Sequence, residues 1–156
     1  MNNKQKMLNV LYCHRQRLMI HIIKFSEELI QRGIHHDDSK FEDEELPYYS
    51  NVIDEFEKHK FGTPEYNKAK DSVYEAVQHH YKKNRHHPEH FPNGIDDMNL
   101  VDLIELLVDW KSASLNHPDK PGNILESLKW ATEKYNISPQ MVKILYNTII
   151  DFKLEK

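Results

Sequence analysis

Residues 99–113 read NLVDLIELLVDWKSA and predict a helix whose apolar residues cover most of its circumference. Such a helix is expected to be buried within a helical fold. Asp102, Glu105 and Asp109 occupy positions i, i+3 and i+7 and therefore share one narrow face. A buried carboxylate must be paired or bind a metal ion, because an unpaired buried charge is very costly. The alternative is a solvated strip on a helix that packs through its other sides.

Helical spacing of apolar residues recurs on both sides of this stretch, and nothing in the sequence reads as a strand. Five or six helices with short connections predict an all-α fold, a compact single-domain helical bundle that spans residues 1–156. The first helix is expected to end at Gly33, because glycine commonly stops a helix. The expected boundaries are about 4–32, 47–59, 64–83, 100–114, 123–135 and 139–152, with loops at 35–45 and 84–97 and a turn at 117–122.

Composition narrows the classes of function. The net charge of −4 and the pI of about 6.2 provide no broad basic surface, so nucleic acid is not an expected partner. Cys13 is the single cysteine, which excludes a disulfide within the chain and suits a reducing compartment. The N-terminus lacks the apolar core of a signal peptide, and no segment approaches the roughly 18 apolar residues of a membrane span. We therefore expect a cytoplasmic protein without a membrane partner.

The histidine content of this sequence is unusually high, at 11 residues, and two histidine clusters contain most of the candidate metal ligands. The first is HHDDSK at 35–40, where His36 and Asp37 offer an imidazole nitrogen and a carboxylate oxygen to one ion. Borderline divalent metals such as manganese, iron or zinc accept that mixture of ligands. For an isolated pair of this kind, a charged and solvated turn is the alternative.

The second cluster is HHYKKNRHHPEH at 79–90. His80 continues the apolar stripe of its predicted helix and is expected to point inward, whereas His79 projects about 100° away and is expected to be partly exposed. His86 and His87 follow the helix, where the chain can turn back over the same pocket. There are two alternatives: a tract of histidines on the surface, or one buried histidine that is hydrogen-bonded within the core.

An early histidine completes the set. His14 lies on or beside the apolar stripe of the first predicted helix, and His21, one heptad later, is its rival for the same role. A single histidine on an apolar face is more often a core residue than a ligand. The other candidate ligands raise the odds that one of the two binds metal.

The order of these residues resembles the HD-domain superfamily of metal-dependent phosphohydrolases, helical bundles whose minimal site is an early His, an HD pair and a late Asp. The match falls on His14, on His36 with Asp37, and on Asp109. The chain is similar above all to a branch of small bacterial and phage HD-like proteins. That branch has the pattern HDxSK, a downstream Glu, HHxxNxHHPEH and MxLxDLxExxxDW, read here at 36–40, 45, 79–90 and 98–110. The 22-residue step from His14 to His36 fits the branch, whereas the 15-residue step from His21 does not.

The resemblance implies one or two divalent ions per chain, drawn from manganese, iron, zinc, nickel or magnesium. His14, His36 and Asp109 would bind one ion, and Asp37 would lie between the two. The second ion would be bound by His80, His86 and His87, since two-metal HD proteins add histidines between the HD pair and the late Asp.

HDDSK also resembles the HDxGK motif of HD-type cyclic-dinucleotide phosphodiesterases, in which the lysine lies near the scissile phosphate. By that resemblance Lys40 is a candidate phosphate contact. Ser39 stands where that motif has glycine, and the GYP signature of those enzymes is missing, so a cyclic dinucleotide is not implied.

Three functions follow from this pattern. The first is hydrolysis of a small-molecule phosphoester, a nucleotide by analogy, with Asp37 and Lys40 in catalytic roles. The second keeps the same ligands and activates oxygen at two irons, as some HD-fold proteins do. The third is a non-enzymatic module that binds a metal, a nucleotide or a host protein. The identity of the metal distinguishes the hydrolase from the oxygenase. A lack of turnover with an intact metal site would support the non-enzymatic module.

Overall fold

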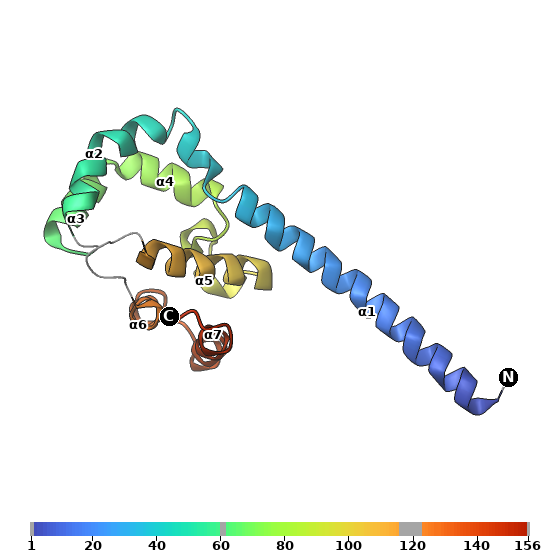
Figure 1. Ribbon diagram of the computed structural model, residues 1–156. Helices are drawn as coiled ribbons and strands as arrows, with labels where there is room; N and C mark the ends of the chain where they lie inside the picture. The colour runs from blue at the N-terminus through green and yellow to red at the C-terminus, as the bar shows by residue number, and fades with distance from the viewer. Residues whose placement is uncertain (1, 60–61, 116–122, 156) are drawn as a thin grey trace. The chain divides into compact units, whose positions relative to one another are not determined.

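The computed structural model describes residues 2–59, 62–115 and 123–155, and these residues form seven α-helices, three short 3₁₀ helices and no strand (Figure 1). The predicted all-α fold is confirmed. The chain divides into two units, residues 1–36 and 37–156. The single domain predicted for residues 1–156 remains a prediction. Within the described residues, none of the helices is long and apolar enough to cross a membrane.

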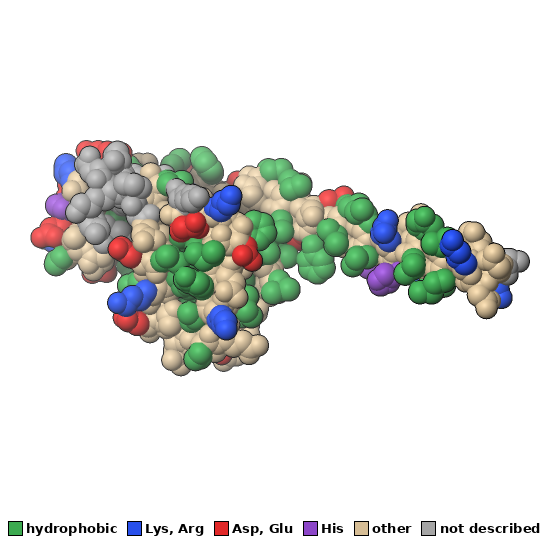
Figure 2. All heavy atoms as spheres, turned by 60° about the horizontal axis from the view of Figure 1, so that its bottom comes forward, with side chains coloured by type: hydrophobic (Ala, Val, Ile, Leu, Met, Phe, Trp, Pro, Cys, Tyr) green, Lys and Arg blue, Asp and Glu red, His purple; other side chains and the backbone are tan. Residues whose placement is uncertain are grey.

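The N-terminal unit, residues 1–36, is built on α1 (Asn3–Ile34). Asn2 caps the helix, since its side chain accepts a hydrogen bond from the Gln5 N–H at 2.9 Å. The helix runs past Gly33, where it was expected to end, to Ile34. None of its residues is buried, and exposed hydrophobic side chains occur along its length, as Figure 2 shows.

The second unit holds the remaining elements. Thr63, Asn123 and Ser138 begin α3, α6 and α7, because each side chain accepts a backbone N–H of the first turn. The predicted turn at 117–122 lies outside the described residues. The elements are η1 (Asp38–Phe41), α2 (Leu46–Lys58), α3 (Pro64–Ser72), α4 (Tyr74–Lys83), η2 (Pro88–His90), η3 (Gly94–Asp97), α5 (Leu100–Leu115), α6 (Ile124–Tyr135) and α7 (Pro139–Asp151).

The single helix predicted over 64–83 is wrong, because α3 and α4 are separate helices that meet at Val73. The Ser72 hydroxyl donates to the Ala69 carbonyl at 2.7 Å, and the Val73 N–H bonds to the Lys70 carbonyl, three residues back, at 3.2 Å. This tightened turn ends α3, as 3₁₀-type bonding commonly does at a helix end. The predicted loops at 35–45 and 84–97 also contain the three 3₁₀ helices.

The hydrophobic core of the second unit is built on α5, which is buried on one side and not around its whole circumference: Leu103, Leu106 and Leu107 are buried, whereas Leu100, Ile104 and Val108 are exposed. Two clusters of buried apolar side chains include residues of α5 and α6, and α6 lies against both α5 and α7 (Figure 1). Because α5 is held by this core, its acidic residues are fixed in place. The first cluster is Ile95, Met98, Leu103, Leu106, Ala131 and Ile137, and the second is Leu107, Ile124, Leu128, Leu145 and Ile149.

Candidate metal centre

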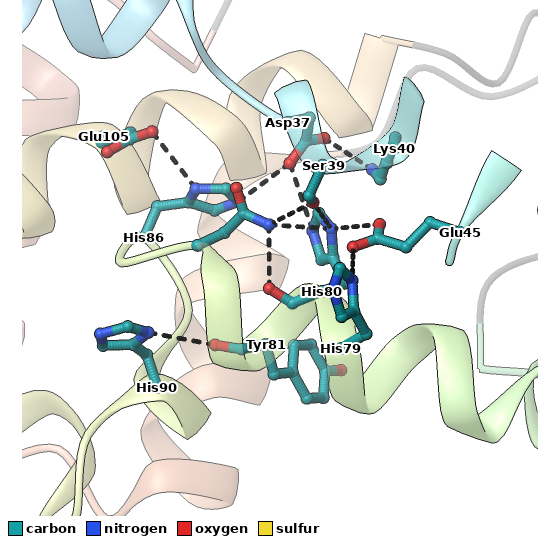
Figure 3. Close-up of polar contacts among 11 residues, drawn as sticks. Asp37, Ser39, Lys40, Glu45, His79, His80, Tyr81, His86, His90 and Glu105 are labelled. Atoms are coloured by element: carbon teal, nitrogen blue, oxygen red, sulfur yellow. Dashed lines mark hydrogen bonds and ion pairs between the residues drawn. The ribbon is translucent and has the colours of Figure 1, made fainter. Parts of the chain in front are cut away.

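Asp37 stands at the turn that leads into η1. Its φ of 62° is in the left-handed region, which few residues other than glycine adopt and which costs roughly 1–2 kcal/mol. The Lys40 N–H closes the turn on the Asp37 carbonyl at 2.8 Å. The 3₁₀ helix that follows contacts α4, and the Asp37 carboxylate points toward the histidines of α4 and of the segment after it (Figure 3).

Three imidazoles converge on this carboxylate. The Oδ1 atom of Asp37 lies 3.2 Å from His80 Nε2 and 3.4 Å from His86 Nε2. His87 joins them, and one ligand atom from each of these four residues lies within 4.8 Å of the other three. The ring centroids are 4.2 Å apart for His86 and His87, and 4.8 Å apart for His80 and His87. Three nitrogens and one carboxylate oxygen thus surround one small space.

A buried or nearly buried carboxylate stands behind two of these rings. His80 Nδ1 lies 2.9 Å from Glu45 Oε2, and His86 Nδ1 lies 3.2 Å from Glu105 Oε1 (Figure 3). An ionised carboxylate only accepts hydrogen bonds, so each Nδ1 is the donor. In the neutral ring, Nε2 then carries the lone pair, and it faces Asp37. This carboxylate–imidazole pairing is the one that commonly orients histidine ligands of metals.

The segment that carries His86 is tied to α5 by a neighbouring ion pair. The Arg85 guanidinium donates to Asp102 through Nε at 3.1 Å and through a terminal nitrogen at 2.9 Å. Asp102 is fully buried, and its Oδ2 also accepts the Asn99 N–H at 3.0 Å, while the Asn99 side chain accepts the Asp102 N–H. This reciprocal cap begins α5. The buried arrangement predicted for the acidic face of residues 99–113 is therefore confirmed for Asp102.

The electrostatics of the cluster keep Asp37 ionised and His87 neutral. Burial acts to raise the pKa of Asp37, but the close contacts of its carboxylate with the His80 and His86 rings and with the Lys40 ammonium outweigh it and hold that pKa well below its usual range. Burial, with the neighbouring His86 and His80, lowers the pKa of His87 to about 2, so this ring is neutral near pH 7. Its Nε2 atom is buried and has no hydrogen-bond partner among the described residues.

Lys40 contacts Asp37 directly. Its Nζ lies 2.6 Å from Asp37 Oδ2, the carboxylate oxygen that faces away from His80 and His86 (Figure 3). The lysine side chain is 45% exposed, so the ammonium also reaches solvent. Its role as a phosphate contact stays a prediction.

Some predicted ligands are not part of this cluster. His14 lies on α1 and His36 follows the end of α1, both within the N-terminal unit. Asp109 lies on α5 and is half-buried, and it is not among the four clustered residues. His79 is partly exposed, as expected, and forms a second group with Glu42 and Glu44, whose carboxylates are both exposed. Their roles as ligands remain predictions or open questions.

Sequence reasoning missed the polar residues that support the cluster. The Asn84 amide donates to Ser39 Oγ at 2.7 Å and to the His80 carbonyl at 2.9 Å, and Arg85 binds Asp102 as described. Asn84 and Arg85 both lie inside the HHYKKNRHHPEH stretch, between its two histidine pairs. The asparagine of the HHxxNxHHPEH pattern was therefore an available signal.

Residues 3–151 match the model of a family of unknown function, DUF5662, and the chain belongs to that family. No curated protein and no solved structure matches the chain. The family has no assigned function, so the chemistry must be inferred from the cluster itself.

Proposed function

We propose that this chain is a metal-dependent phosphoester hydrolase whose centre includes Asp37, His80, His86 and His87. The observation that carries the proposal is His87 Nε2, a buried nitrogen without a hydrogen-bond partner among the described residues, set beside two further imidazoles and a carboxylate. A buried polar atom of this kind is rare and needs an explanation. A divalent cation bound by all four residues supplies one.

The donor set fits a borderline divalent cation. Three imidazole nitrogens and one carboxylate oxygen suit zinc, manganese, iron or nickel better than calcium or magnesium, which prefer oxygen ligands. The His80 and His86 rings present Nε2 toward Asp37, because Nδ1 of His80 is hydrogen-bonded to Glu45 and Nδ1 of His86 lies 3.2 Å from Glu105 Oε1. Without a cation, two neutral rings of this tautomer would direct lone pairs at a carboxylate oxygen.

The resemblance to HD-domain phosphohydrolases supplies the reaction class. A bound divalent ion there acidifies a water and polarises the phosphate. In this chain Asp37 would bind the ion through Oδ1, and Lys40 on its other oxygen would offset phosphate charge. His14, His36 and Asp109 remain predicted ligands of a second ion. A nucleotide is the proposed substrate class, by analogy with the superfamily.

Elemental analysis of protein purified without a chelator and without added metal tests the binding part of the proposal. We expect a borderline transition metal at one or two ions per chain. Asp37→Asn keeps the shape of the side chain and tolerates the left-handed backbone, and it should lower the metal content. Metal-free protein that also binds no added manganese or zinc would overturn the proposal.

Turnover of a nucleotide panel by manganese-loaded protein tests the reaction class. Hydrolysis that is lost in Asp37→Ala would support it, whereas hydrolysis that survives this change would point to a contaminating phosphatase. Tightly held iron with oxygen consumption would instead favour an oxygenase. A loaded centre without any turnover would favour a binding module.

A further inference from the structure

Glu45 is a fully buried carboxylate at the start of α2 that binds two adjacent histidines at once. Its Oε1 lies 2.8 Å from His79 Nδ1, and its Oε2 lies 2.9 Å from His80 Nδ1 (Figure 3). Only His80 belongs to the cluster with Asp37. The His79 side chain is 23% exposed, and its contact with Glu45 is its shortest polar contact.

Three polar atoms lie near His80 Nδ1, namely Glu45 Oε2 at 2.9 Å, Asn84 Nδ2 at 3.1 Å and Ser39 Oγ at 3.2 Å, and only the carboxylate oxygen must accept. The Asn84 amide nitrogen lies 3.1 Å from His80 Nδ1, but its two hydrogens are directed to Ser39 Oγ and to the His80 carbonyl. Glu45 is the nearest acceptor for an Nδ1 hydrogen, and an ionised carboxylate has only lone pairs to offer. With the hydrogen on Nδ1, the lone pair of the ring lies on Nε2, on the side of Asp37.

His79 completes the hydrogen bonding of the same carboxylate. A buried carboxylate with one oxygen unsatisfied is strongly penalised, so a second donor is needed. His79 supplies it from the neighbouring position on α4, and the two contacts together fix the plane of the carboxylate. His79 can therefore act on His80 through Glu45 without contacting the cluster at Asp37.

We propose that Glu45 and His79 form a positioning pair that holds His80 as the Nδ1–H tautomer, with Nε2 directed at the metal centre. The inference rests on the proposed function in that His80 is taken as a metal ligand. It adds two residues that determine the affinity of the centre without touching the ion. It also explains why two adjacent histidines have different roles.

Glu45→Gln is the sharpest change, because the two side chains have nearly the same shape. The amide offers one acceptor and one donor group, so it cannot accept from both histidines, and one ring must change its tautomer or lose its partner. We expect the affinity for zinc or manganese to fall about 10–100-fold, the usual effect of losing such a partner. Asp43→Asn, an exposed acid two residues earlier, is the matched control and should bind as the wild type does.

Two substitutions of His79 test whether its hydrogen bond to Glu45 affects zinc binding. His79→Ala removes the donor to Glu45 and should weaken zinc binding in the same direction as Glu45→Gln. His79→Asn places an amide N–H near the position of Nδ1 and should restore at least half of the lost binding free energy. A merely structural role predicts that the two variants lose affinity equally.

Calorimetric titration of the full-length protein with zinc alone, together with nitrogen NMR of the imidazole rings, separates the possible results. Weaker zinc binding with a changed His80 tautomer in Glu45→Gln would support the pair. Unchanged affinity and tautomer in Glu45→Gln and in His79→Ala would overturn it. If Glu45→Gln does not fold, the comparison of His79→Ala with His79→Asn decides. Wild-type protein that binds no ion but shows the Nδ1–H tautomer of His80 would overturn the metal proposal and not the positioning pair.

Discussion

His86 Nδ1 lies 3.2 Å from Glu105 Oε1, which joins the second histidine cluster to the middle of α5. The preceding residue, Arg85, binds Asp102 one turn earlier on the same helix. Two successive residues are thus held by carboxylates at i and i+3 of a helix that the core fixes. The position of the His86 ring is therefore set by α5 as well as by the segment that carries it.

The Arg85–Asp102 pair predicts an asymmetric response to mutation. Asp102 is fully buried, whereas the Arg85 side chain is 42% exposed and can be solvated when its partner is removed. Arg85→Met removes both guanidinium hydrogen bonds from this buried carboxylate, so we expect a loss of about 3 kcal/mol in the free energy of unfolding. Asp102→Asn, which keeps the cap of α5, should lose less. Urea denaturation of both variants checks the order, and an equal loss would contradict the argument.

Features that depend on local sequence pattern, such as helix position, helix caps and the buried side of a helix, are predicted well from the sequence. The apolar pattern of residues 100–115 correctly indicated a helix that contributes to the core, although only one side of it is buried, and its period of 3.6 placed Asp102 and Glu105 on one face. The inward direction of His80 also follows from its place on the stripe of α4. The caps at Thr63 and Ser138 follow from residue type alone.

Contacts between distant segments are not predictable in this way. Glu45 is 35 residues from His80, and no local pattern states that one carboxylate binds both His79 and His80. The break at Val73 coincides with the Ser72 hydroxyl bond and with the three-residue backbone bond of Val73, while the apolar period continues through it. The left-handed turn at Asp37 is likewise a product of its surroundings, because aspartate has only a weak preference for that conformation.

Removal of metal should lower the melting temperature of the wild-type protein. An ion at about 100 times its dissociation constant stabilises the folded state by about 2.7 kcal/mol, provided that it does not bind the unfolded chain. For a chain of this size that corresponds to a shift of roughly 5–10 °C. Scanning calorimetry with and without chelator measures it. Identical melting curves would argue against a tightly occupied centre.

His87→Leu tests the observation on which the proposed function rests. A ring that served only packing would leave its Nε2 atom unsatisfied, so an apolar replacement of similar size should then be neutral or stabilising. A ring that binds the ion instead predicts a clear loss of zinc affinity, together with a metal-free form that is no less stable than the wild type. Titration with zinc and chelator-treated melting curves distinguish the two, and undiminished affinity would remove His87 from the centre.

His14→Ala and His21→Ala compare the two candidate early ligands. Both side chains are exposed on α1, so neither change should destabilise that helix strongly. From the spacing to His36, we expect the metal content to fall by up to one ion per chain in His14→Ala and to stay unchanged in His21→Ala. Elemental analysis of the two proteins gives the answer. The opposite result would assign the role to His21 and remove the spacing match.

Lys40→Met is expected to lower turnover without removing the metal. The Lys40 ammonium contacts Asp37 Oδ2, and a protonated amine does not ligate a cation, so Oδ1 and the three imidazoles should still bind the ion. The Asp37 side chain is 20% exposed, which allows water to replace the lost hydrogen bond. If Lys40 also contacts the phosphate, kcat should fall by about 100-fold, the usual effect of losing one donor to developing charge. Metal content and kcat measured on one preparation test both parts. A loss of metal would mean that Lys40 serves to orient Asp37, and unchanged kcat with full metal content would make it a surface residue.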